Sequence, residues 1–230
     1  MSDLAGLTER YSLDAPAERK LLLLLERLSS DEHVPSAVTG REGVLEHHIA
    51  DSLVGLELPQ VRAAGSIADI GAGAGLPGLV LAAALPGALV TEVESQQRKA
   101  AYVESLSAAA GIENARVVAE RAEEWPGGVE ANDLVTARAL AAQPVVLEYA
   151  APLLRTGGFL VEWRGRRDAE DERAGDAAAA ELGLERREVR AVRPFESARD
   201  RHLHVFEKVA ATPPGFPRRS GVASRRPLGR

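Results

Sequence analysis

The chain has 230 residues, 45% of them hydrophobic, which is enough for one domain with a full core. It contains no cysteine, which excludes disulfides, thiolate zinc sites and cysteine nucleophiles. The net charge of −6 argues against a polyanion partner for the chain as a whole. The first residues lack the basic start and apolar stretch of a secretory leader, and no run approaches the roughly 20 apolar residues that span a bilayer. We therefore expect a cytoplasmic protein.

The N-terminal part is expected to be helical. Residues 15–32 place a row of leucines on one helical face, and residues 42–57 form a second amphipathic pattern. The face residues are Leu21, Leu22, Leu24, Leu25 and Leu28 in the first helix and Leu45, Ile49, Leu53 and Leu56 in the second. A polar break at 29–39, which contains Pro35, separates them. Residues 1–60 are thus predicted to form a helical segment packed on the main domain.

Strand-like and helix-like runs then alternate. The predicted strands are 66–70, 88–93, 115–119, 133–137 and 158–163, and the predicted helices are 77–85, 95–110, 142–154 and 168–182. This order predicts a mostly parallel sheet with helices on both faces. Residues 187–193 and 202–209 both resemble strands joined by a short loop, so they should pair antiparallel. A seven-stranded sheet ending in such a hairpin is the Rossmann-like fold of class I methyltransferases, and NAD-binding Rossmann domains lack the hairpin.

The end of the chain differs in composition from the predicted domain at 61–210. Residues 211–230, here called the C-terminal segment, contain five arginines and no acid, together with four prolines. Without this segment the net charge would be −11. We expect the C-terminal segment to lack regular structure, either as a solvated extension or as a basic arm for a polyanion.

A glycine-rich loop follows the first predicted strand. Gly71, Gly73 and Gly75 precede Leu76 and Pro77, and a second apolar run ends at Glu94, nineteen residues beyond Gly75. Glycines allow a tight turn and close approach to a ligand, and an acid at this spacing can bind the two ribose hydroxyls. The pattern predicts an adenosine-containing cofactor, with a turn needed only for packing as the alternative.

Two further positions address the identity of the cofactor. Asp69, two residues before the first glycine, could hold the amino-acid end of S-adenosylmethionine, whereas it would only repel a pyrophosphate. Its alternative role is to accept hydrogen bonds from the N–H groups of the loop. Ala122 and Glu123 follow the third strand, where this architecture meets adenine, although Glu123 could equally be a solvated acid.

Arg138 follows the fourth predicted strand, at the place where methyltransferases acting on exocyclic amines carry Pro-Pro and an aromatic residue. The absence of cysteine removes enzymes that add a thiolate to a pyrimidine. A target that is already nucleophilic remains, and guanine N7 fits because no proton need be removed. Arg138 could grip the cofactor or the target, or form an ion pair with Asp69 or Glu94.

More positive charge is expected at the same sheet edge. Arg164 follows the fifth strand, and Arg201 and His202 enter the last one, so each could face a phosphate or a base. His47 and His48 could join them, but neighbours on a helix point in different directions and make a poor metal site. We expect no metal. Asp51 could orient either histidine.

Together these motifs resemble the bacterial small-subunit ribosomal RNA (guanine-N7)-methyltransferase G family, also called the glucose-inhibited division protein B family. The matching segments run from Thr39 to Lys208: His48–Ser52, Asp69–Gly78, Glu94-Ser95, Arg98-Lys99, Ala137–Ala139, Arg164-Gly165 and Arg201–Leu203, with Phe216–Gly221 beyond. The chain departs from the family in having Arg164 where lysine is usual, and a guanidinium fork and an ammonium are not interchangeable. His47, Ala50 and Glu94 are further departures.

The resemblance implies S-adenosylmethionine as methyl donor and N7 of one guanine in 16S rRNA, near the decoding centre, as target. It implies cofactor contacts at Gly71, Leu76, Glu94, Ala122, Glu123 and Arg138. The substrate would be rRNA, the 30S subunit or an assembly intermediate, and the protein a monomer. The alternatives are a small-molecule methyltransferase on the same fold, a non-catalytic nucleotide- or RNA-binding module and, less favoured, an NAD-dependent oxidoreductase. To reconcile RNA binding with an acidic chain, we expect the other basic residues and the C-terminal segment to converge on the cofactor face.

Overall fold

A computed structural model describes residues 3–31 and 33–229. Met1, Ser2, Glu32 and Arg230 lie outside the described residues, so the last residue of the predicted 15–32 helix and one arginine of the C-terminal segment are among those not described. Within the described ranges, no helix combines the length and the apolar character that crossing a bilayer requires.

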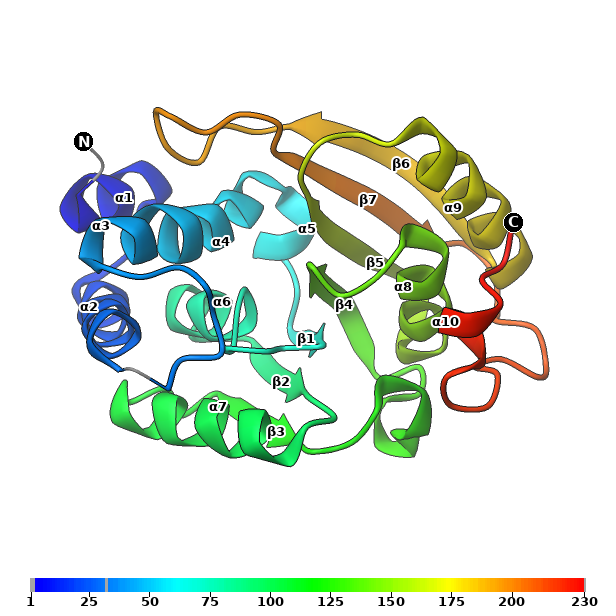
Figure 1. The fold of residues 1–230 in the computed structure, drawn as a ribbon, viewed down its shortest axis with the longest axis horizontal. Helices are drawn as coiled ribbons and strands as arrows, with labels where there is room; N and C mark the ends of the chain where they lie inside the picture. Colours follow the sequence, from blue (N-terminus) through cyan, green and yellow to red (C-terminus); the bar gives the residue numbers. More distant parts are fainter. Residues whose placement is uncertain (1–2, 32, 230) are drawn as a thin grey trace.

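One mixed sheet organises the molecule, with strand order β3-β2-β1-β4-β5-β7-β6 (Figure 1). The strands are β1 (Ser66–Ile70), β2 (Leu89–Val93), β3 (Ala115–Val118), β4 (Asn132–Arg138), β5 (Leu154–Arg164), β6 (Leu184–Ala191) and β7 (His202–Lys208). The first five strands run parallel, and β7 lies antiparallel between β5 and β6. This confirms the predicted fold, including the terminal hairpin.

Helices cover both faces of the sheet (Figure 1). They are α1 (Leu4–Tyr11), α2 (Ala15–Ser30), α3 (Arg41–Val44), α4 (Asp51–Leu53), α5 (Pro59–Arg62), α6 (Gly78–Ala84), α7 (Gln97–Ala109), α8 (Gln143–Ala150), α9 (Ala169–Leu182) and α10 (Val222–Arg225). Successive strand residues point to opposite faces. Ile67 therefore joins the core under α1 to α7, whereas Ala68 joins the core under α8 and α9.

The N-terminal helices pack on the first of these cores. Asp14 caps α2 by accepting from the Ala17 N–H at 2.9 Å, and the helix buries its leucine face against α6. The predicted 42–57 helix forms, but not as a uniform α-helix. A π-helical turn, η1 (Leu45–Ala50), follows α3, and a 3₁₀ turn, η2 (Val54–Glu57), follows α4. Gly55 lies against the Trp163 ring, where a Cβ would come within 2.5 Å, so this helix approaches β5 closely.

Among the described residues of the C-terminal segment, only the short helix α10 has regular structure, but the segment packs on the domain. Helix α10 packs against α8, and Phe216 packs on the second core. Arg218 reaches Glu148 of α8, a side chain only 1% exposed, through its Nε at 2.8 Å and through Nη2. A buried carboxylate needs a cationic partner, and Arg218 is that partner. Composition alone does not reveal this pairing.

Candidate active site

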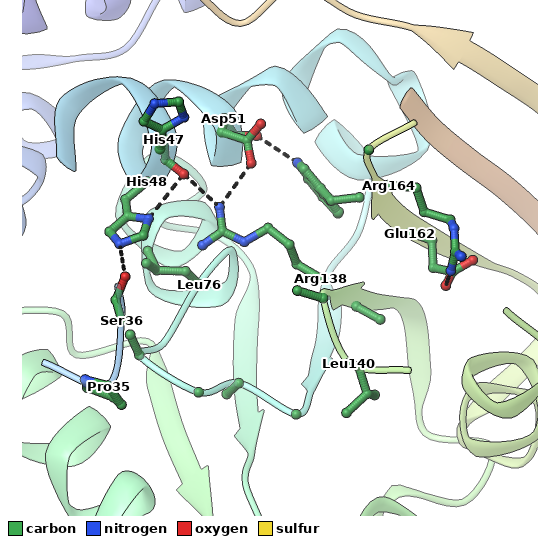
Figure 2. Close-up of a pocket in the computed structure, with 18 of the residues that line it drawn as sticks. Pro35, Ser36, His47, His48, Asp51, Leu76, Arg138, Leu140, Glu162 and Arg164 are labelled. Carbon is green, nitrogen blue, oxygen red and sulfur yellow. Dashed lines mark hydrogen bonds and ion pairs between the residues drawn. The ribbon is translucent and has the colours of Figure 1, made fainter. Parts of the chain in front are cut away.

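A pocket of about 920 Å³ opens at the carboxyl ends of β1, β2, β4 and β5. Such an edge is where open α/β sheets bind ligands. The loop after β1, the start of the segment after β2, the ends of β4 and β5, and the η1–α4 helix all line it (Figure 2). Of the predicted site residues, it brings together Gly71, Gly73, Leu76, Glu94, Arg138, Arg164, Arg201 and His202. Asp69, Gly75, Ala122 and Glu123 do not line it.

The glycines of the loop have different roles. Gly71, Gly73 and Gly75 all have positive φ, at 68°, 62° and 81°, which favours glycine. A Cβ on Gly75 would come within 2.6 Å of the buried Leu79, so this position is also closed by packing. A Cβ on Gly73 would meet nothing nearer than 3.7 Å. Gly73 therefore offers exposed backbone to the pocket, as a cradle for a cofactor requires.

Glu94 lies at the end of β2, where the ribose contact is predicted. Its carboxylate accepts from the Gly73 N–H at 3.0 Å and the Gln96 N–H at 2.8 Å, and the residue is 5% exposed. These contacts fix the carboxylate beside the glycine loop. Each carboxylate oxygen has two lone pairs, so both can also accept from a diol.

Asp69 is buried beneath the loop and accepts from the Gly78 N–H at 2.9 Å and from the Thr136 hydroxyl at 2.8 Å. These contacts match its alternative role, in which it holds the loop. Glu92 stands opposite it in the β1–β2 register and is fully buried. Burial raises the pKa of Asp69 to about 6, and burial together with the neighbouring Asp69 raises the pKa of Glu92 well above its usual range. Sequence reasoning missed Glu92, although an acid inside an apolar strand pattern was a signal.

Arg138 contacts neither Asp69 nor Glu94 through the ion pair considered from the sequence. Its Nη1 donates to Asp51 Oδ2 at 3.0 Å and to the His47 carbonyl at 3.2 Å (Figure 2). Asp51 does not orient a histidine. The His48 ring instead contacts the Ser36 hydroxyl at 2.8 Å, and burial lowers the pKa of His48 to about 4. The two histidines do diverge: His47 meets the Phe195 ring. Among the described residues, no cluster of three or more histidines and acids could hold a metal.

Arg164 lines the pocket, but two carboxylates hold its guanidinium. Nη1 donates to Glu162 Oε1 at 2.8 Å and Nη2 to Asp171 Oδ2 at 2.5 Å. Glu162 and Arg164 lie together at the opposite end of the pocket from Ser36 and His48 (Figure 2). Glu162 also accepts from Gln143 at 2.8 Å. Sequence reasoning missed both acids. Glu162, two residues before Arg164, was visible only as a charge inside the fifth strand.

The other basic residues divide between two surfaces. Lys99 and Arg166 line the pocket with Arg138, Arg164 and Arg201. By contrast, Arg186, Arg187 and Arg190 of β6 form ion pairs with Asp176, with Glu185 and Glu207, and with Glu188. No described residue of the C-terminal segment lines the pocket. Its contact near the cofactor region is the Gly221 N–H, which donates to Glu123 at 3.3 Å. The convergence expected from the sequence therefore includes only part of the basic residues.

The strand order, the terminal hairpin and the glycine loop define a class I methyltransferase fold. A solved fibrillarin from Aeropyrum pernix, described with natively bound S-adenosyl-L-methionine, shares this fold with a TM-score of 0.53 and 20% identity over 68% of this chain and 72% of its own. A family model described as rRNA small subunit methyltransferase G matches residues 24–203.

Curated relatives agree with the family match. Ribosomal RNA small subunit methyltransferase G of Deinococcus deserti is 38% identical, with 90% of this chain and 86% of that protein covered. The protein of the same name from Rubrobacter xylanophilus is 38% identical, with 95% and 89% covered. The chain belongs to the rRNA small subunit methyltransferase G family.

Proposed function

We propose that the protein transfers a methyl group from S-adenosylmethionine to N7 of one guanine in the 16S rRNA of the small ribosomal subunit. One observation carries this proposal. The glycine loop with Glu94 and the arginines Arg138, Arg164 and Arg201 open into the same pocket. A glycine loop suited to a methyl donor and arginines able to contact RNA thus line one pocket. Family membership agrees with this assignment.

The residues present fit the cofactor. Gly73 has backbone open to the pocket, and Glu94 stands beside it with its carboxylate fixed by two N–H groups. Glu94 would bind the ribose hydroxyls, and Gly71, Gly73 and Leu76 would line the path of the amino-acid end, while Asp69 and Gly75 shape the loop from beneath. Ala122 and Glu123 are proposed for the adenine, and the Gly221 N–H donates to the Glu123 carboxylate at 3.3 Å.

Methyl transfer to guanine N7 does not require acid–base catalysis. When bound, S-adenosylmethionine supplies an electrophilic methyl group, which guanine N7 takes with its lone pair while sulfur keeps the electrons of the broken C–S bond. No proton leaves N7, so the chain needs no general base at that atom. Its residues have to orient the guanine toward the methyl group. Arg138 is placed to bind a carboxylate or the guanine O6, and Arg201 and His202 to face RNA.

The RNA partner would approach over the pocket rim. Lys99, Arg166 and Arg201 supply positive charge there, although the whole chain carries −6. Local charge rather than net charge steers a polyanion to a site. We propose a monomer that acts in the cytoplasm on 16S rRNA, the 30S subunit or an assembly intermediate.

The test is transfer of labelled methyl from S-adenosylmethionine to 16S rRNA or to 30S subunits from cells that lack this activity. N7-methylguanine is then mapped by borohydride–aniline cleavage. One strong cleavage in the decoding-region loop is expected. Cofactor binding without transfer to any RNA form would overturn the proposal and favour a small-molecule substrate.

A further inference from the structure

Asp51 contacts two arginines that come from separate parts of the chain. Its Oδ2 accepts from Arg138 Nη1 at 3.0 Å, and its Oδ1 lies 3.4 Å from Arg201 Nε. Arg138 ends β4, whereas Arg201 immediately precedes β7. Asp51 is 7% exposed, and all three residues line the pocket. One buried carboxylate therefore joins the two basic groups.

The backbone around Asp51 is fixed independently of its side chain. The Trp163 ring N–H donates to the Asp51 carbonyl at 2.7 Å, which ties the helix to β5. The preceding π-helical turn widens the helix, and the Asp51 N–H donates to the Glu46 carbonyl, five residues earlier. The His47 carbonyl accepts from Arg138 at 3.2 Å. Replacing the carboxylate should thus leave the helix in place.

The charges explain why one acid serves two arginines. Two guanidinium groups at one wall of a pocket repel each other, and a carboxylate between them offsets that repulsion. The Oδ1 atom is buried and has no hydrogen bond in the structure, because its contact with Arg201 has ion-pair distance without hydrogen-bond geometry. The Arg138 contact is hydrogen-bonded and the Arg201 contact is looser, so Arg201 can move toward RNA without breaking the Arg138 contact.

We propose that Asp51 is a positioning residue that sets Arg138 for the cofactor and Arg201 for RNA, and so couples the two binding events. The inference rests on the proposed function for the identity of the two ligands. The arrangement of the three side chains does not depend on the proposed function. Loss of the carboxylate should weaken the binding of both ligands. It should affect cofactor binding only through Arg138.

A double-mutant cycle tests whether Asp51 acts on cofactor binding through Arg138. Asp51→Asn, Arg138→Gln and the double variant are titrated calorimetrically with S-adenosylmethionine. We expect Asp51→Asn to weaken binding by about tenfold, the scale of a charge-assisted hydrogen bond, and to add less than about twofold in the Arg138→Gln background. Additive effects, or unchanged affinity in Asp51→Asn, would overturn the proposal. Glu42→Gln, an exposed charge removal on α3, is the matched control, with unchanged binding expected.

RNA binding tests the coupling between the two ligands. It also distinguishes failure of this proposal from failure of the proposed function. With 16S rRNA as probe, S-adenosylmethionine should tighten RNA binding by the wild type and do so less in Asp51→Asn. Equal tightening in both proteins contradicts the coupling. If the wild type methylates no RNA, the assigned function fails. The Asp51–Arg138 and Asp51–Arg201 cycles measured on thermal unfolding still decide the arrangement, since non-additive effects support it and additive effects refute it.

Discussion

The two halves of the pocket are built in different ways. The cofactor half uses backbone: a loop of positive-φ glycines that follows β1 and is braced by Asp69 of β1 and by Glu94, which follows the neighbouring β2. The arginine half uses long side chains, and Arg138, Arg164 and Arg201 are each held by an acid from another element: Arg138 and Arg201 by Asp51, and Arg164 by Asp171. The first half is specified locally and the second by tertiary contacts. Substitutions should therefore affect the two halves differently.

The largest effect is expected at Arg164. Arg164→Ala leaves Glu162 and Asp171 without their shared cation, and both acids are buried. Breaking such a pair from one side costs about 3 kcal/mol in the free energy of unfolding. Chemical denaturation measures this loss, and Arg164→Lys, which keeps the charge but not the fork, should recover part of it. A loss below about 1 kcal/mol would show that Arg164 faces solvent or RNA instead.

Within the glycine loop, two substitutions should separate folding from binding. Gly75→Ala combines the strain of a positive φ with overlap against buried Leu79, which together cost about 3 kcal/mol. Gly73→Ala meets only the strain, about 1 kcal/mol, but places a methyl group in the pocket and should weaken cofactor binding. Thermal unfolding and calorimetric titration test the pair. Equal stability losses would contradict the assigned roles.

The buried acids Asp69 and Glu92 predict a pH dependence. Both have raised pKa values in the folded state, so the folded chain holds more protons than the unfolded chain above about pH 4. Their contribution to stability is complete below that pH and is lost as the pH rises through about 6, the pKa of Asp69. Glu92→Gln keeps a hydrogen-bond donor and removes the charge.

We expect Glu92→Gln to stabilise the protein at pH 7, because the buried acid is no longer ionised there, and to show no gain near pH 4. The buried histidines His48 and His204, with pKa values lowered to about 4, have the opposite pH dependence. Both proteins contain these histidines, so the histidine contribution cancels in the difference in free energy of unfolding between the variant and the wild type. A difference in the free energy of unfolding that stays constant with pH, measured by chemical denaturation, would contradict the raised pKa values of Asp69 and Glu92.

The smallest effect is expected from the C-terminal segment on RNA binding. Arg218 is neutralised by Glu148, α10 packs on α8, and no described residue of the segment lines the pocket. Removing residues 211–230 should lower the unfolding temperature while the slope of RNA affinity against salt concentration stays the same. A flatter slope, measured by filter binding over a salt series, would restore the basic-arm hypothesis.

The sequence predicts the fold well, because alternating apolar periodicities report strands and helices directly. It also locates Gly71, Gly73 and Glu94, since their spacing is local. It does not reveal that Asp51 pairs with Arg138, 87 residues away, or that Arg218 docks on Glu148, because many acids could serve and only packing selects one. The amphipathic pattern likewise does not reveal the π-helical turn before Asp51.

The central claim is that both halves form one site. Titration of S-adenosylmethionine into the wild type and into Arg138→Ala, with circular dichroism to confirm that both are folded, tests it most directly. We expect the wild type to bind one equivalent and Arg138→Ala to bind about tenfold or more weakly, since a charge-assisted contact is lost. Equal affinity would assign Arg138 to the substrate or to structure and contradict the account.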